Sequence, residues 1–176
     1  MNILAGDSAN LQVTLKGSDN NPLSNNAVAV IIDGVSREVV TDDNGVAKLS
    51  VKYSSAGTHY VTVSFAGDDD FKSSIGSGKV VVGKKSTALK APKPTLKVKK
   101  AKKISITLKS NGKAIANKKI TLKVNGKTFS AKTNSKGVAS IKVKVTKKGT
   151  FKYTAKFAGD GAYKAVSKTG KIIVKK

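Results

Sequence analysis

Residues 149–164 read Gly-Thr-Phe-Lys-Tyr-Thr-Ala-Lys-Phe-Ala-Gly-Asp-Gly-Ala-Tyr-Lys, and this stretch indicates how the chain folds. The residues at 151, 153, 155 and 157 are apolar, and they alternate with Lys and Thr. A period of two is typical of a β-strand that buries one face on a core. The Ala-Gly-Asp that follows is typical of a turn, in which the Asp160 carboxylate caps backbone N–H groups.

The same pattern occurs 92 residues earlier in the chain. Phe65-Ala66-Gly67-Asp68 matches Phe157-Ala158-Gly159-Asp160, and residues 22–83 align with residues 114–175 without a gap. Of these 62 aligned pairs, 19 are identical. Solenoids and propellers repeat at roughly 20–50 residues, so this period is the size of a domain. We therefore expect two tandem domains, residues 1–83 and 84–176.

Alternating runs recur through both copies and are separated by turn residues. Asp33-Gly34 and Asn125-Gly126 suit two-residue hairpins. In the second copy we expect strands near residues 88–98, 103–109, 119–124, 128–133, 137–145, 149–157 and 170–175. About seven short strands in each copy predict an all-β fold of two immunoglobulin-like β-sandwiches.

The first strand of each copy is expected to depart from a regular strand. Pro92 and Pro94 lack the N–H that a sheet needs, so this strand should lie at a sheet edge and kink there. The first copy has only Met1 to Ala9 where this strand belongs, and we expect its first strand to be shortened.

Composition excludes several kinds of function. The 176 residues contain no Cys, no Trp and one His, which rules out thiol chemistry, zinc ribbons and multi-histidine sites. No apolar run approaches the 18 residues of a membrane span. No pair of catalytic groups is indicated either, so we expect no enzyme activity and no cofactor.

Charge is divided very unevenly between the two copies. The net charge of +24 combines 6 basic and 9 acidic residues in 1–83 with 28 lysines and one acid, Asp160, in 84–176. So strong an excess destabilises a compact state by self-repulsion, and a bound polyanion would relieve it. Outward lysines also give solubility and block edge pairing, and this alternative stays open. The predicted polyanion contacts are Lys99, Lys100, Lys102, Lys103, Lys123, Lys142, Lys144, Lys152 and Lys156.

The scarcity of Arg and aromatic residues beside the lysines limits the kind of polyanion that we expect. Sequence-specific nucleic-acid binders usually add Arg for base contacts and aromatic residues for stacking, but the second copy has no Arg and few aromatic residues. An anionic cell-wall polymer or host-cell glycan therefore fits better. Non-specific nucleic-acid binding through the lysines is the alternative. Carbohydrate binding by stacking is a third hypothesis, weakened by the absence of Trp.

Acidic residues in the first copy raise a separate question. Asp68, Asp69 and Asp70 could supply oxygen ligands to Ca²⁺. Their spacing does not match a calcium-binding loop, and the second copy has Gly161 and Ala162 in place of the last two. A solvated turn is the favoured interpretation, and no metal site is predicted.

The run from Asn125 to Lys164 resembles the bacterial immunoglobulin-like (Big-type) repeats of cell-surface adhesins. Its Lys-rich character is similar to that of the adhesin-like surface proteins of methanogenic archaea. The resemblance extends over both copies, and Phe-Ala-Gly-Asp is its most specific part. It implies an extracellular adhesive or stalk module at the cell surface, with neighbouring repeats and a host-cell glycan or protein as partners.

Overall fold

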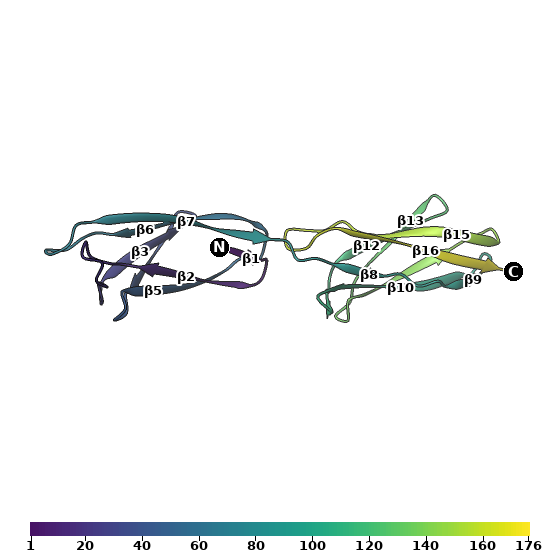
Figure 1. Cartoon of the computed structure of the whole chain (residues 1–176). Coiled ribbons are helices and arrows are strands. Elements are labelled where there is room, and N and C mark those ends of the chain that lie inside the picture. The colour runs from purple at the N-terminus through teal and green to yellow at the C-terminus, as the bar shows by residue number, and fades with distance from the viewer. The chain divides into compact units, whose positions relative to one another are not determined.

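A computed structural model describes all residues, 1–176, and it contains two compact units, Met1–Lys84 (unit 1) and Lys85–Lys176 (unit 2). Every regular element is a β-strand (Figure 1), so the predicted all-β fold is confirmed. None of the elements is a helix that could span a membrane. In each unit the strands form two separate sheets.

Unit 2 has a larger and a smaller sheet. The larger sheet has the order β13-β12-β15-β16-β9, and the smaller sheet pairs β10 with β8, β11 and β14. The strands are β8 (Ala88–Lys90), β9 (Thr95–Lys97), β10 (Ala101–Ser110), β11 (Lys113–Ala114), β12 (Lys119–Val124), β13 (Lys127–Lys132), β14 (Val138–Lys144), β15 (Gly149–Phe157) and β16 (Val166–Lys175).

Unit 1 repeats this plan with fewer strands. Its larger sheet has the order β1-β7-β6-β3-β4, and its smaller sheet contains only β2 and β5. The strands are β1 (Asn2–Leu4), β2 (Ser8–Thr14), β3 (Ala27–Ile32), β4 (Val35–Val40), β5 (Val46–Lys52), β6 (Gly57–Phe65) and β7 (Ser74–Gly83).

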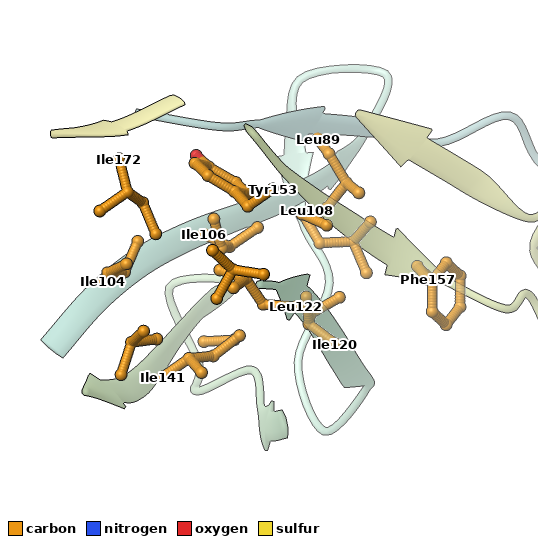
Figure 2. Packing of buried hydrophobic residues seen from close by; sticks show 14 of the residues in the cluster. Leu89, Ile104, Ile106, Leu108, Ile120, Leu122, Ile141, Tyr153, Phe157 and Ile172 are labelled. Carbon is orange, nitrogen blue, oxygen red and sulfur yellow. The ribbon is translucent and has the colours of Figure 1, made fainter. Parts of the chain in front are cut away.

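The core of unit 2 lies between its two sheets. Leu108 and Ile141 come from the smaller sheet, Leu122 and Tyr153 come from the larger sheet, and all four are at most 1% exposed (Figure 2). These are the inward residues of the predicted period-two pattern. Burial of this apolar surface drives the packing of one sheet on the other.

A buried threonine ties a loop to the sandwich at the same place in both units. Thr133 is 2% exposed, donates to the Ile115 carbonyl at 2.7 Å and accepts from the Lys118 amide at 2.9 Å. Thr41 makes the two equivalent bonds in unit 1. Because the hydroxyl both donates and accepts, two loop groups are satisfied away from water.

The predicted hairpin turns are confirmed. Asp33 and Gly34 have φ values of 49° and 84°, and Asn125 and Gly126 have φ values of 48° and 74°. Positive φ at both central residues is the conformation that favours Asn-Gly and Asp-Gly, because its twist matches that of the flanking strands.

The first strand of unit 2 differs from the expected single strand over 88–98. It is two strands on different sheets: β8 pairs with β10, and β9 pairs with β16. The four residues between them include Pro92 and Pro94, which cannot donate to a ladder, so the chain changes sheets there. The edge position and the break at the prolines are confirmed. With β11 as well, unit 2 has nine strands rather than about seven.

Unit 1 has one short strand, β1, where unit 2 has β8 and β9. Its β1 pairs in parallel with β7, as β9 does with β16, but no strand in unit 1 matches β8. The smaller sheet of unit 1 consequently lacks the strand that borders β10 in unit 2.

Gly170 and its counterpart Gly78 provide a test of core packing. A Cβ at Gly170 would lie 2.5 Å from the Tyr153 ring, whereas a Cβ at Gly78 meets nothing within 4 Å. We expect Gly170→Ala to lower the free energy of unfolding of unit 2 by about 1–3 kcal/mol through overpacking. Gly78→Ala should leave unit 1 as stable or about 0.5 kcal/mol more stable. Hydrogen exchange at the strand amides measures both, and equal effects would contradict the packing difference.

Candidate functional site

The structure divides the nine predicted lysines among three places in unit 2. Lys123, Lys152 and Lys156 lie on the outward side of the larger sheet, on β12 and β15. A second set, Lys103, Lys142 and Lys144, lies on the outward side of the smaller sheet, on β10 and β14. The remaining three are at the β9–β10 turn and the start of β10. The nine residues therefore do not form one patch.

The turn lysines are placed by backbone geometry. Lys99 has a positive φ of 59°, and its amide donates to the Val145 carbonyl at 2.9 Å. Lys102 uses its Nζ to donate to the Thr95 carbonyl at 2.9 Å. The Lys102 ammonium is thus engaged in joining β9 to β10, while Lys99 and Lys100 extend from an exposed turn.

The outward side of the larger sheet carries the broadest array of lysines, which we call the lysine face. Strand register places Lys152 opposite Lys171, Lys119 opposite Lys132, and Lys97 opposite Lys175. Like charges directly opposite each other are destabilising in a sheet. The members of the lysine face, all exposed, are Lys97, Lys119, Lys123, Lys132, Lys152, Lys156, Lys171 and Lys175.

The face also contains hydroxyl side chains between the lysines. Lys123 lies opposite Thr154, and Thr154 is flanked along β15 by the outward residues Lys152 and Lys156. Residues two apart on a strand are about 7 Å apart, and neighbouring strands are about 4.8 Å apart. The three ammonium groups therefore surround a threonine at spacings that an extended anionic chain can bridge.

The same positions in unit 1 carry almost no charge. Register matches Lys123 to Ile31, and Lys152 to Tyr60. The counterparts of Lys119, Lys132 and Lys156 are Ala27, Val40 and Ser64. On this side of unit 1, Lys79 is the remaining cation and Glu38 is an acid. Unit 2 therefore differs from unit 1 most on this side of the larger sheet.

The smaller sheets differ less. Lys103 and Lys142, which face each other in unit 2, correspond to Asn10 and Ser50, but Lys144 corresponds to Lys52. Unit 1 also carries Lys48 on the outward side of β5. Lysines on the smaller sheet are thus common to both units, while the lysine face belongs to unit 2.

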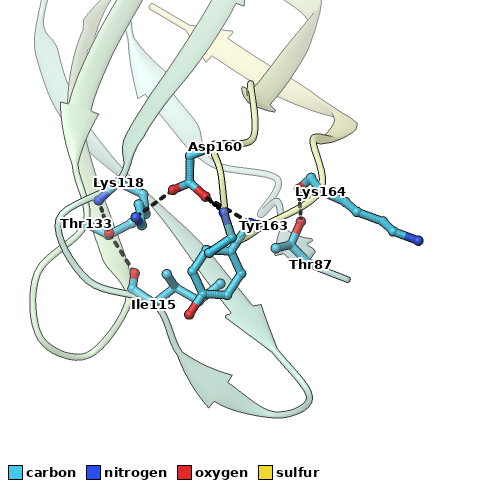
Figure 3. A network of polar contacts seen from close by, with 8 residues as sticks. Thr87, Ile115, Lys118, Thr133, Asp160, Tyr163 and Lys164 are labelled. Atoms are coloured by element: carbon cyan, nitrogen blue, oxygen red, sulfur yellow. Dashed lines mark hydrogen bonds and ion pairs between the residues drawn. The ribbon is translucent and has the colours of Figure 1, made fainter. Parts of the chain in front are cut away.

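The single acid of unit 2, Asp160, forms its contacts with its own turn and with Lys118 (Figure 3). It does not pair with a lysine of the lysine face. One Asp160 oxygen accepts from the amides of Ala162 and Tyr163, both at 2.9 Å. The other is 2.6 Å from the Lys118 Nζ, which also lies 5.4 Å from the centre of the Tyr163 ring. The predicted role of Asp160 as a turn-capping carboxylate is confirmed.

These contacts change the acidity of Asp160. Partial burial by itself raises the pKa, because it disfavours the charged form. The hydrogen bonds from Lys118 and the two amides, with the Lys118 charge, act in the opposite direction and prevail. The Asp160 pKa is therefore lowered from its ordinary value of 3.8.

The aspartates considered for Ca²⁺ lie in the equivalent turn of unit 1. Asp68 accepts from the amides of Asp70 and Phe71 at 3.0 and 2.7 Å, so it has the same capping role as Asp160. Asp69 and Asp70 are exposed. The structure has no group of three or more His, Cys, Asp or Glu side chains placed to hold a metal ion.

Sequence reasoning missed five members of the lysine face and the partner of Asp160. Lys97, Lys119, Lys132, Lys171 and Lys175 join the face through cross-strand register, and Lys118 reaches Asp160 from the loop before β12. The alternation of each strand is visible in the sequence. Which residues of different strands lie opposite each other is decided by the pairing.

Comparisons with known proteins show the fold. No protein-family model matches the chain, and no curated protein matches it in sequence. Among solved structures, the chain is similar to invasin, a bacterial integrin-binding protein (TM-score 0.53, 18% identity, covering 97% of this chain and 39% of that one). It is also similar to the titin domains Z1Z2 solved with telethonin (TM-score 0.53, 12% identity, covering 99% and 91%). The D0-D1 domains of intimin match at a TM-score of 0.38 and 18% identity, covering 98% and 94%.

The predicted fold class, tandem immunoglobulin-like sandwiches, is confirmed by the similarity to invasin and to the titin domains together with the sheet order. The chain spans about two-fifths of the invasin structure that it matches.

Asp160→Asn separates the charge of this side chain from its capping role, because an Asn oxygen can still accept the two amides. We expect unit 2 to lose about 1 kcal/mol of unfolding free energy at pH 7. Since the folded pKa is lowered, the contribution of the carboxylate is present above about pH 4 and is lost as pH falls through the folded pKa. Urea unfolding between pH 2 and 7 should therefore show a weaker acid dependence for the variant.

Asp68→Asn is the matched control, because Asn26 stands in unit 1 where unit 2 has Lys118. It should cost unit 1 less than Asp160→Asn costs unit 2. Identical pH profiles for the wild-type chain and Asp160→Asn would contradict the ion-pair account.

Proposed function

We propose that this chain is a non-catalytic adhesin or stalk module of the cell surface, in which the lysine face of unit 2 contacts an anionic polymer. The tandem immunoglobulin-like fold supports the stalk role, since such sandwiches present large outward sheet faces on a stable core. The proposed partner is an anionic cell-wall polymer or a host-cell glycan. The proposed location is extracellular, and the domain division proposed is 1–83 and 84–176.

The main support for this proposal is that most lysines on the larger sheet of unit 2 are replaced by uncharged residues at the matching positions of unit 1. One backbone plan carries eight lysines on the larger sheet of unit 2, and at the same positions unit 1 keeps only one lysine, Lys79. Solubility and edge protection need only a few scattered charges, and they give no reason to concentrate lysines in the middle of a sheet. Contact with a polyanion gives such a reason.

Electrostatic cost favours the same conclusion. Three pairs of lysines stand directly opposite each other on the lysine face, and the one carboxylate of unit 2 is bonded to Lys118 instead. The folded unit therefore carries repulsion that none of its own residues relieves. A bound polyanion would neutralise these charges and release the counterions that accompany it.

The chemistry of lysine indicates what kind of recognition to expect. An ammonium group is a strongly hydrated point charge, without the planar fork by which Arg recognises phosphate or a base edge. Binding by the lysine face should therefore depend on charge density and salt rather than on polymer sequence. Phosphate- or carboxylate-bearing surface polymers meet this requirement, and sequence-specific DNA recognition does not.

Two triple variants with equal charge loss test which face binds. Lys123→Gln, Lys152→Gln and Lys156→Gln together alter the lysine face, and Lys103→Gln, Lys142→Gln and Lys144→Gln together alter the smaller sheet. The first variant of the full chain should elute from heparin at lower salt than the second. With polyphosphate, its plot of log affinity against log salt should be shallower than that of the wild-type chain by about 2, because each lost contact removes roughly 0.7–0.9 from the slope.

All six positions are exposed and outward, so the circular dichroism spectrum should be unchanged and serves as the folding control. Melting temperatures should be unchanged or slightly higher, because each variant removes like-charge repulsion. Equal effects of the two variants would refute the lysine face as the binding surface. Salt-resistant binding to one DNA duplex over a shuffled duplex would favour the alternative, a nucleic-acid-binding protein.

A further inference from the structure

An apolar groove opens along unit 1 between β2 and β7, with a volume of about 550 Å³. Its walls are Leu11 to Leu15 on one side and Ser74 to Lys79 on the other. The floor is formed by core side chains of β3 and β6, including Val28, Val30, Val61, Val63 and Phe65. A second hollow of about 420 Å³ shares Leu15, Phe65 and Ser74 with the groove and extends toward Asp70, Phe71 and Lys72.

Unit 2 holds part of its own chain at the matching place. There β8 runs antiparallel to β10, with Leu89 opposite Leu108. Leu89 is 5% exposed and belongs to the core. By the register of β2 and β10 with their partners β5 and β14, the counterparts of Thr107, Leu108 and Lys109 are Thr14, Leu15 and Lys16. The groove and hollow of unit 1 thus follow the path that residues 85–92 take in unit 2.

Several polar contacts hold that segment in unit 2. The Lys85 amide donates to the Ala162 carbonyl at 2.8 Å, and Thr87 donates to the Lys164 carbonyl at 2.9 Å. At the other end the Tyr153 hydroxyl donates to the Pro92 carbonyl. The residues of unit 1 that match Ala162 and Lys164 are Asp70 and Lys72, which line the second hollow.

The core of unit 1 is less covered in consequence. Leu11 and Val13 are only half-buried, whereas their counterparts Ile104 and Ile106 are 1% and 0% exposed. Val61 stands where unit 2 has Tyr153, which leaves open space above Gly78. An added strand would remove this apolar surface from water, which favours its binding.

We propose that this groove is a strand-acceptor site. Its occupant is an extended segment of the chemistry of residues 86–93, running antiparallel to Thr14–Lys16. Recognition is by strand addition, in which backbone pairing supplies affinity and one inward leucine supplies specificity. This inference is independent of the lysine face.

The geometry at Met1 shows where such a segment can be attached for a test. The Val81 amide donates to the Met1 carbonyl at 2.9 Å, as the Ile173 amide donates to the Pro94 carbonyl at 3.0 Å. Met1 therefore occupies the place of Pro94, and a residue attached to Met1 would stand where Lys93 stands in unit 2. The path from there into the groove is the path that Ala91 to Lys93 take from β8 in unit 2.

Grafting this segment onto the full chain tests the proposal. The test variant carries Ser-Thr-Ala-Leu-Lys-Ala-Pro-Lys, a copy of residues 86–93, before Met1. The matched control carries Ser-Thr-Ala-Lys-Leu-Ala-Pro-Lys, with the same composition and charge but with its leucine moved to the outward side. Hydrogen exchange at amides 12–17 and 70–78 is measured in both variants and in the original chain.

We expect exchange in these two segments to slow at least tenfold in the test variant and to remain unchanged in the control. The amides of β10 and β16 in unit 2, which already has its strand, should not respond in either variant. No slowing, or equal slowing by both grafts, would overturn the proposal. Protection that is present without a graft and that increases with protein concentration would also overturn it, because a second copy would then be the occupant.

Discussion

Successive side chains along each strand point to opposite faces of its sheet, and both the packed core and the charged surfaces follow from this alternation. Inward residues such as Leu122 and Tyr153 must fill the space between two sheets, while their outward neighbours meet only solvent. An outward residue can therefore change its charge without altering the inward residues on either side of it. That freedom lets one backbone plan carry a near-neutral face in unit 1 and a face of eight lysines in unit 2.

The two units agree where side chains satisfy the backbone groups of loops and turns. Thr41 and Thr133 bind their loops through the same two hydrogen bonds, and Asp68 and Asp160 cap the same turn. The two buried threonine positions are limited by the cost of an unpaired buried group, which is about 1–3 kcal/mol. Outward strand positions have no such limit. The differences between the units gather there, and for that reason the proposed polyanion contact lies on an outward face.

The units also differ in how completely the smaller sheet is built. In unit 2, β8 covers Leu108 and the segment is tied to the loop after Asp160. In unit 1 the equivalent edge of β2 borders a groove over the core. A sandwich tolerates this because its larger sheet and the β2–β5 pair already bury most of the interior, with Val28 and Val30 at 1% and 0% exposure. The edge is left available for pairing with another extended segment.

Comparing the chain with itself is enough to find the repeat. The period-two strands, the Asn-Gly and Asp-Gly hairpins and the turn at Asp160 are also predictable from the amino acids, because each depends on residues close together in the chain. The positions of Pro92 and Pro94 indicated an interrupted edge strand. Folding in three dimensions was needed to show that this strand divides between two sheets, that the nine predicted lysines lie in three places, and that Lys118 pairs with Asp160. These features depend on which strands pair and in what register, and pairing joins residues that are distant in sequence.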